Sequence, residues 1–198
     1  MKLTKLKYCL LALLLSISFA GIKAQEIDFG TYSSVYSVTI SPLSVSDLEF
    51  GTLINSEGMV NIPLSSSKVL TIEGVRYLDV IVTVTAEQYL LLDDNLACET
   101  DPSCRLEFTL NAAYANRGVN STGQATVMTG TQLVQNGQFQ IRKRGNAPPG
   151  PPPTPVYEGY NPALFNDTAY LYIYGSVDVG DIDSGAYSSD ITVMISYD

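Results

Sequence analysis

The stretch from Gly185 to Asp198, GAYSSDITVMISYD, constrains the fold more than any other part of the chain. Apolar residues alternate in it with mostly polar ones, and this period of two is typical of a β-strand with one buried face. The given chain ends directly after this pattern, so we expect a terminal strand that pairs with its own sheet or with another molecule. The residues expected on the buried face are Ile191, Val193, Ile195 and Tyr197.

The first 24 residues have the pattern of a secretory signal peptide. Three lysines precede an apolar run at 9–19, which is too short to span a bilayer comfortably. Small residues follow, and we expect cleavage after Ala24, with cleavage after Ala20 as the alternative. No other stretch stays apolar for about 18 residues, so no transmembrane helix is predicted. The sequence therefore predicts an exported protein.

The exported part is strongly acidic. The chain has 11 Lys and Arg residues against 20 Asp and Glu residues, and four of the lysines but no acidic residue lie in the predicted signal peptide. Subtracting those four leaves seven basic residues and a formal charge of −13. Such a surface repels nucleic acids and anionic membranes, so we expect neither as a partner.

Two cysteines follow the signal peptide, Cys98 and Cys104, in the stretch CETDPSC. The Asp-Pro pair between them predicts a turn that brings the two sulfur atoms together. In the oxidising environment expected of an exported protein, this pair favours a disulfide that closes a short loop. A metal site is not expected, because two cysteines without any histidine do not fill a coordination shell.

The chain contains no histidine, which removes the commonest general base and the usual Ser–His and Cys–His pairs. Acidic residues are plentiful, yet none lies in a motif that fixes a catalytic pair. Asp178, Asp181 and Asp183 precede Gly185 but lack the further ligands of an EF-hand loop, so a plain turn is expected. We therefore predict no catalytic, metal or cofactor site.

Most of the chain consists of short apolar stretches separated by Gly, Pro, Asn and Asp, and no amphipathic run predicts a helix. The stretch 78–85 is mostly β-branched and is expected to be a central strand buried on both sides. About 8–10 strands in one domain, 35–198, predict an all-β antiparallel sandwich. Besides the terminal strand, the candidate strands lie near 35–40, 43–50, 59–62, 69–72, 78–85, 89–92, 106–110, 139–141 and 169–179, with a hairpin around Thr129-Gly130 in 124–134.

Two segments are expected to lie apart from the regular sandwich. Residues 25–34 form an N-terminal extension whose apolar alternation changes parity near Gly30, so it is either a flexible leader or a strand available to another subunit. Residues 145–155, GNAPPGPPPTP, favour polyproline II and a surface position. We interpret them as a loop insertion, with a ligand for an aromatic groove as the less favoured alternative.

Tyr170, Tyr172 and Tyr174 share one face of the predicted strand at 169–179. This row can form an aromatic surface for sugars, or an aromatic ladder that stabilises the sheet without a ligand, which we favour. Asp167-Thr168-Ala169 resembles an O-glycosylation pattern of some exported Gram-negative proteins. Asn120-Ser121-Thr122 matches the N-glycosylation sequon but carries no weight after a signal peptide of bacterial type.

Three short motifs occur in the chain in this order: Leu48-Glu-Phe50-Gly51, Gly175-Ser-Val177-Asp-Val179 and Gly185-Ala-Tyr187. Together with the glycine fourteenth from the end and the penultimate tyrosine, they resemble an uncharacterised family of secreted Gram-negative proteins that is related to spore-coat-U-like and chaperone–usher fimbrial proteins. The likeness covers both ends of the chain and hardly the middle.

This resemblance implies an immunoglobulin-like sandwich and a structural role in a fimbria-like surface assembly. In such proteins the sandwich lacks one strand, and a periplasmic chaperone and then the N-terminal extension of another subunit fill the groove. The implied partners are other copies or related subunits and a chaperone, with residues 25–40 as the donor. The implied assembly groove is lined by Gly185, Ile191, Val193, Ile195 and Tyr197.

A second hypothesis stays open at this point. Ten candidate strands are enough to close a complete sandwich, so the chain could instead be a self-contained exported binding module. Its ligand would be a glycan or a protein, bound through the tyrosine row or the proline-rich loop.

Overall fold

The computed structural model describes residues 37–143 and 165–198, which belong to one compact unit, Tyr36–Asp198. The predicted signal peptide, the extension at 25–34 and the proline-rich loop at 145–155 lie outside the described residues. The described part is built almost wholly of strands, and its helical segments are 3-10 turns of three or four residues. No helix in these two ranges is long and apolar enough to cross a membrane.

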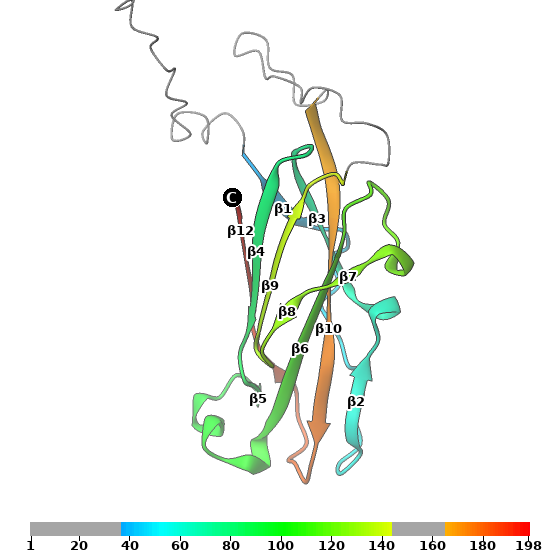
Figure 1. The fold of residues 1–198 in the computed structure, drawn as a ribbon. Coiled ribbons are helices and arrows are strands. Elements are labelled where there is room, and N and C mark those ends of the chain that lie inside the picture. Colours follow the sequence, from blue (N-terminus) through cyan, green and yellow to red (C-terminus); the bar gives the residue numbers. More distant parts are fainter. Residues whose placement is uncertain (1–36, 144–164) are drawn as a thin grey trace, which may run out of the picture. The chain divides into compact units, whose positions relative to one another are not determined.

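The strands form two antiparallel sheets that pack into a sandwich, as the sequence predicts (Figure 1). The larger sheet has the order β1-β3-β10-β6-β5-β11, with β2 added on β10 and β7 added on β6. Its strands are β1 (Thr39–Pro42), β2 (Gly58–Ile62), β3 (Lys68–Val75), β5 (Tyr89–Leu92), β6 (Arg105–Ala115), β7 (Thr126–Val127), β10 (Asn166–Val179) and β11 (Tyr187–Ser188).

The smaller sheet has the order β12-β4-β9-β8. Its strands are β4 (Asp79–Ala86), β8 (Thr129–Gly130), β9 (Val134–Gln140) and β12 (Ile191–Tyr197). The 3-10 turns are η1 (Leu64–Ser66), η2 (Leu96–Glu99), η3 (Pro102–Cys104) and η4 (Thr122–Gln124).

The core lies between the two sheets and is made of alternate residues on facing strands. On β4 these are Val80, Val82 and Val84, and on β6 they include Leu106, Phe108 and Leu110. Alternation places every second side chain of a strand on the same face, which is why these stretches bury one face each. The full cluster also draws residues from β3, β9 and β10, and the partly buried residues of β12 pack against it.

The strand that is buried on both faces is β10 and not β4, which corrects the expectation for 78–85. β4 is central in its sheet, but its outward residue Ile81 is 39% exposed. Leu171 and Ile173 of β10 face the core, while the opposite face, with Tyr172, packs against a separate small cluster. The run of β-branched residues thus predicted correctly that β4 is central in its sheet. It did not indicate that the outward face of this strand stays partly exposed.

Other boundaries differ from the predicted ones. The hairpin formed by β8 and β9 turns after Gly130, so Thr129 and Gly130 lie in its first strand. β1 begins at Thr39 and runs through Pro42 at the outer edge of its sheet, where a missing backbone donor costs little.

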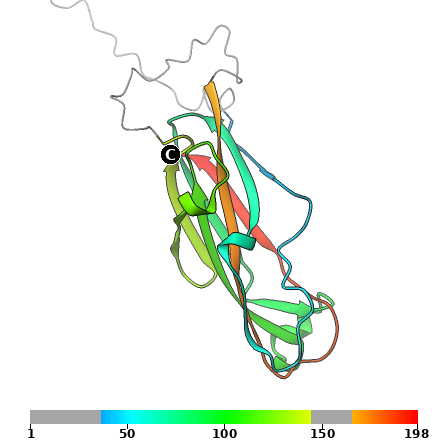
Figure 2. The ribbon, with the colours of Figure 1, turned by 90° about the vertical axis from the view of Figure 1, so that its right-hand side faces the viewer.

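The stretch 43–57 contains no strand, although an apolar strand was expected at 43–50. Leu43 and Val45 are exposed, Val45 fully, while Leu48, Phe50 and Leu53 are half-buried against the core. In Figure 2 this segment, in blue after β1, runs beside the red strand β12. Its apolar residues do not keep the strict alternation that a strand requires.

Candidate functional site: a groove beside strand β12

A groove of about 1110 Å³ opens between the two sheets beside β12. Its floor is apolar and comes from four strands of the larger sheet, while Ile191 and Val193 form the wall on β12. Segments 47–53 and 182–190 form the other sides. The floor residues are Leu70 on β3, Leu90 on β5, Leu106 and Phe108 on β6, and Ile173 on β10.

β12 lies at the edge of its sheet and pairs with β4 along seven residues, from Ile191 opposite Ala86 to Tyr197 opposite Val80. The N–H of Glu87 donates to the carbonyl of Asp190, and the N–H of Asp198 donates to the carbonyl of Asp79. Even-numbered residues of β12 therefore bond to β4, and odd-numbered residues direct their N–H and C=O groups to the other side.

The outer edge of β12 carries no paired strand within ranges 37–143 and 165–198. The backbone groups of Ile191, Val193 and Ile195 point to this edge, and the side chains of the same residues face inward. At Ile191 and Val193, which also line the groove, the edge therefore offers hydrogen bonds where the groove offers apolar contacts. An exposed edge of this kind is a template for another strand.

The predicted groove residues divide into two groups. Gly185, Ile191 and Val193 line the groove, whereas Ile195 and Tyr197 lie past its end and pack against the core. The floor residues were not identified from the sequence as site residues. They lie on strands far apart in the chain, so no local motif could have brought them together.

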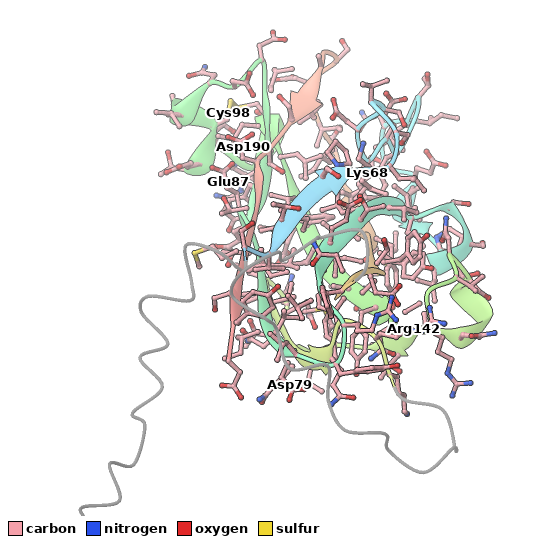
Figure 3. The ribbon with its side chains drawn as sticks, turned by 90° about the horizontal axis from the view of Figure 1, so that it is seen from above. Lys68, Asp79, Glu87, Cys98, Arg142 and Asp190 are labelled. Atoms are coloured by element: carbon pink, nitrogen blue, oxygen red, sulfur yellow. A yellow bond between two sulfur atoms is a disulfide. The ribbon has the colours of Figure 1, made fainter. Side chains whose placement is uncertain are left out.

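The rim of the groove is charged, and four of its five charged groups are acidic: Asp47, Glu49, Asp183 and Asp190. The fifth is Lys68, which donates from Nζ to the carbonyl oxygens of Ser44 and Ser46. At one end, the N–H of Asp190 donates to Glu87 Oε2 at 3.4 Å (Figure 3). The groove thus combines an apolar floor with a mostly acidic rim.

Tyr187 lies where β11 meets the groove, and its hydroxyl donates to the carbonyl of Asp183 at 2.7 Å. Burial raises the pKa of this hydroxyl, and the nearby carboxylates of Asp183 and Asp93 raise it further. The group therefore remains a protonated donor at any physiological pH, and it holds the turn that leads into β12.

The Sγ atoms of Cys98 and Cys104 lie at disulfide distance, and their Cα atoms are 5.3 Å apart. The pair links the turns η2 and η3 and packs with Leu91 away from the groove. Asp101 stabilises the turn by accepting from the N–H and hydroxyl of Ser103, and these bonds hold the pKa of its carboxyl below the usual range. The cysteine pair therefore stabilises this loop and is not part of the groove.

The tyrosine row on β10 is not an open surface, which agrees with the favoured interpretation of aromatic packing and not with the alternative of a ligand surface. Tyr172 is 0% exposed, and Tyr170 and Tyr174 are partly buried in the same cluster. The hydroxyl of Tyr172 donates to Asn120 Oδ1 at 2.8 Å, so the loop before η4 covers the ring. The row acts as packing between β10 and this loop.

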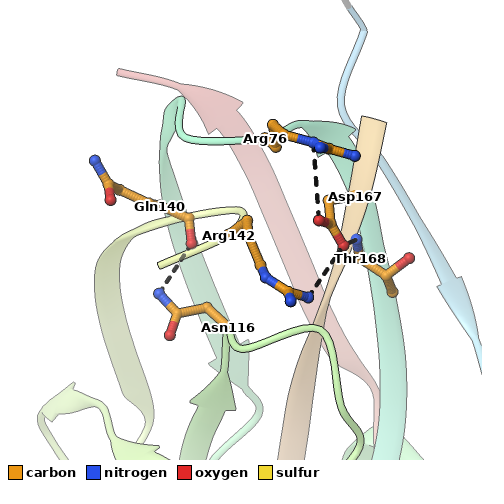
Figure 4. Close-up of polar contacts among 6 residues, drawn as sticks. All are labelled: Arg76, Asn116, Gln140, Arg142, Asp167 and Thr168. Carbon is orange, nitrogen blue, oxygen red and sulfur yellow. Dashed lines mark hydrogen bonds and ion pairs between the residues drawn. The ribbon is translucent and has the colours of Figure 1, made fainter. Parts of the chain in front are cut away.

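Asp167, in the stretch that resembles an O-glycosylation pattern, lies between two arginines (Figure 4). Its carboxylate is 3.9 Å from Arg76 Nε and 3.6 Å from Arg142 Nη1. It also accepts from the N–H of Thr168 at 2.9 Å. Arg142 and Asp167 stand on either side of the segment outside the described residues, so this ion pair holds the ends of β9 and β10 together.

No group of three metal-binding side chains comes together among the residues that the structure describes. Asp178 lies on β10, and Asp181 accepts from Asn55 Nδ2 at 2.9 Å. Asp183 contacts Ser103 and Tyr187 instead of its two acidic neighbours. Asp181 and Asp183 therefore belong to the turn that leaves β10, and Asp178 belongs to the strand itself.

No family model matches this chain, and neither a curated protein nor a solved structure is significantly similar to it. The resemblance to fimbrial proteins therefore stays a prediction from the sequence motifs.

Proposed function

We propose that this protein is an exported structural subunit of a fimbria-like surface assembly, joined through the groove beside β12. The observation that supports the proposal best is a coincidence at Ile191 and Val193: they line an apolar groove, and they lie on a strand edge with which no other described strand pairs. A strand from another molecule would hydrogen-bond to this edge and place alternate side chains on the groove floor, which is β-augmentation.

The N-terminal extension of another copy is the proposed occupant. Residues 25–36 precede the described part and contain apolar side chains on both parities, such as Ile27 and Phe29, or Tyr32 and Tyr36. Twelve extended residues reach about 40 Å, whereas the seven residues of β12 span about 23 Å. The extension is thus long enough to pair with all of β12 and still connect to its own domain.

An assembly of this kind is heterologous, because the extension of one copy binds the groove of the next. Repetition of such a contact without closure gives a filament. In the periplasm, a chaperone would occupy the same groove first and keep the apolar floor from aggregating, as in the fimbrial systems that the sequence resembles. Related subunits could replace further copies in the same contact.

Deletion of residues 25–34 tests the proposal. We expect the truncated protein to fold with an unchanged thermal unfolding temperature and to remain a monomer in size-exclusion chromatography. The full exported chain should form larger species under the same conditions. If the truncated protein forms the same larger species, the extension is not the donor and the proposal is wrong.

Substitutions in the extension provide matched variants, because only one parity can face the groove. One variant changes Ile27 and Phe29 to Asn, and the other changes Tyr32 and Tyr36 to Asn. We expect one of them to abolish assembly and the other to leave it nearly intact. Equal effects of both variants would argue against insertion as a strand.

The structure offers less support for a glycan-binding module. That hypothesis relied on the tyrosine row at 170–174 or on the proline-rich loop. The central ring of the row, Tyr172, is fully buried, and the loop lies outside the described residues.

A further inference from the structure

The segment 47–53, which we call the strap, forms one side of the groove beside β12. Three of its side chains, Leu48, Phe50 and Leu53, pack against the core residues of the sandwich. The ring of Phe50 meets that of Phe108 on the groove floor edge to face, with 6.1 Å between the centroids. The strap thus places apolar side chains in the same groove that an incoming strand would need.

Hydrogen bonds fix the chain on both sides of the strap. Before it, the N–H of Leu43 donates to the carbonyl of Val69 at 3.0 Å, and Lys68 Nζ binds the carbonyls of Ser44 and Ser46. After it, the N–H of Ile54 donates to Glu57 Oε2 at 2.9 Å, and the N–H of Ser56 donates to the carbonyl of Gly180 at 2.8 Å. Both ends are therefore anchored to the sandwich.

Between these anchors, residues 47–53 make no hydrogen bond within the described part of the chain. Gly51 has φ +77°, a conformation that favours glycine, and a Cβ added there would have nothing within 4 Å. The middle of the strap is consequently held by apolar contacts alone. Moving it out of the groove breaks no hydrogen bond, and an incoming strand would gain those of the β12 edge.

We propose that the strap is a resident competitor for the groove, displaced when the strand of another subunit enters. This inference rests on the proposed function, because it concerns the same groove and the same occupant. While the strap is in place, the ring of Phe50 occupies the space beside Phe108 on the floor. Displacement would expose Phe50 and let the incoming apolar side chains take its position.

A tryptophan at position 50 reports this movement directly, because the chain has no tryptophan of its own. We would add a synthetic peptide of residues 25–38 to the exported chain carrying Phe50→Trp, and follow the fluorescence. We expect the emission maximum to shift to longer wavelength with the same concentration dependence as peptide binding. Binding of the peptide without a shift would overturn the inference, because the strap would then have stayed in the groove.

The second measurement compares peptide binding by two variants in which the strap is held less tightly. Phe50→Ala removes the main contact and should tighten peptide binding about tenfold, the effect of a partly buried aromatic side chain. Gly51→Ala keeps every side-chain contact but strains the bend, and should tighten binding a few-fold. Val45→Ala is the control, because Val45 lies just before the strap and is fully exposed, so its truncation should not change peptide binding.

The outcomes separate this inference from the proposed function. If the wild type and the loosened variants bind the peptide equally well, the strap does not compete and only this inference is wrong. If none of these folded proteins binds the peptide, both the inference and the proposed function are wrong. A thermal unfolding transition of each variant shows that it is folded. If Phe50→Ala does not fold, the comparison of peptide binding uses Gly51→Ala instead.

Discussion

The hydroxyl of Tyr197 on β12 accepts a hydrogen bond of 2.9 Å from the backbone N–H of Val75 on β3. The bond joins the edge strand of the smaller sheet to a strand of the larger one, past the end of the groove. Gly74 leaves room for this contact, because a Cβ there would lie 2.7 Å from the Tyr197 hydroxyl oxygen. The penultimate tyrosine thus closes the sandwich at one end, while the groove stays open at the other.

Removal of this hydroxyl should destabilise the fold. Val75 is buried, so in Tyr197→Phe its N–H loses its acceptor without access to water, and the free energy of unfolding should fall by about 1–3 kcal/mol. Urea denaturation with an unchanged slope measures the effect. Tyr89→Phe is the control, since the Tyr89 hydroxyl bonds only the exposed side chain of Gln88 in the described structure. Equal stability of Tyr197→Phe and the wild type would contradict this role.

The ion pairs of Asp167 should contribute a smaller, salt-dependent amount. Asp167→Asn leaves Arg76 and Arg142 without their carboxylate, and because the three side chains are partly exposed we expect a loss of about 1 kcal/mol. The loss should shrink in high salt, which screens exposed pairs. Asp178→Asn, an exposed site on the same strand, should have no such effect. A loss that is the same at all salt concentrations would assign the role of Asp167 to its hydrogen bond with Thr168.

Alkaline pH should destabilise the protein through buried tyrosines. Burial raises the pKa of Tyr172 above its ordinary value of about 10, so the unfolded state gives up this proton first. The stability linked to Tyr172 is then complete below about pH 10 and is lost as the pH rises through the folded-state pKa. Tyr172→Phe should flatten this decline, measured by denaturation from pH 8 to pH 11. It should not abolish it, since burial also raises the pKa of Tyr174 and Tyr187.

Reduction of the cysteine pair should weaken the protein without unfolding it. The pair closes a loop of only seven residues, for which the chain-entropy model gives about 2 kcal/mol. We expect Cys98→Ser with Cys104→Ser to lower the urea midpoint and to keep the circular dichroism of a β-protein. Loss of the folded signal in the double variant would mean that the small cluster around Leu91 supports more of the fold than its size indicates.

Apolar alternation with a period of two predicted the strands well, because this pattern lies within the sequence of each strand. β2, β5, β10 and β12 lie where apolar alternation indicated them, and the all-β sandwich follows from their number and spacing. The second face of a strand is not a local property. Leu171 faces the core between the sheets, whereas Tyr172 faces the other way and is covered there by the loop that holds Asn120, which the alternation of β10 could not indicate.

The residues of the groove could likewise be predicted only where a local pattern indicates them. Ile191 and Val193 could be assigned to it because the terminal strand has a clear inward face. Phe108 and Ile173 could not, because the groove exists only where four separate strands and the strap converge. The strap itself looked like a strand, since its apolar content was visible in the sequence while its lack of backbone hydrogen bonds was not.

The most direct test of the account is a charge placed in the groove, compared with the same charge on the opposite face of β12. Val193→Asp points into the groove, and Thr192→Asp points away from it. Both proteins, confirmed as folded, would be recovered from their native cells and run on gels with and without boiling. We predict that wild type and Thr192→Asp give a ladder that collapses to one band on boiling, and that Val193→Asp gives a single band in both lanes. An equal ladder for Val193→Asp, or no ladder for the wild type, would contradict assembly through this groove.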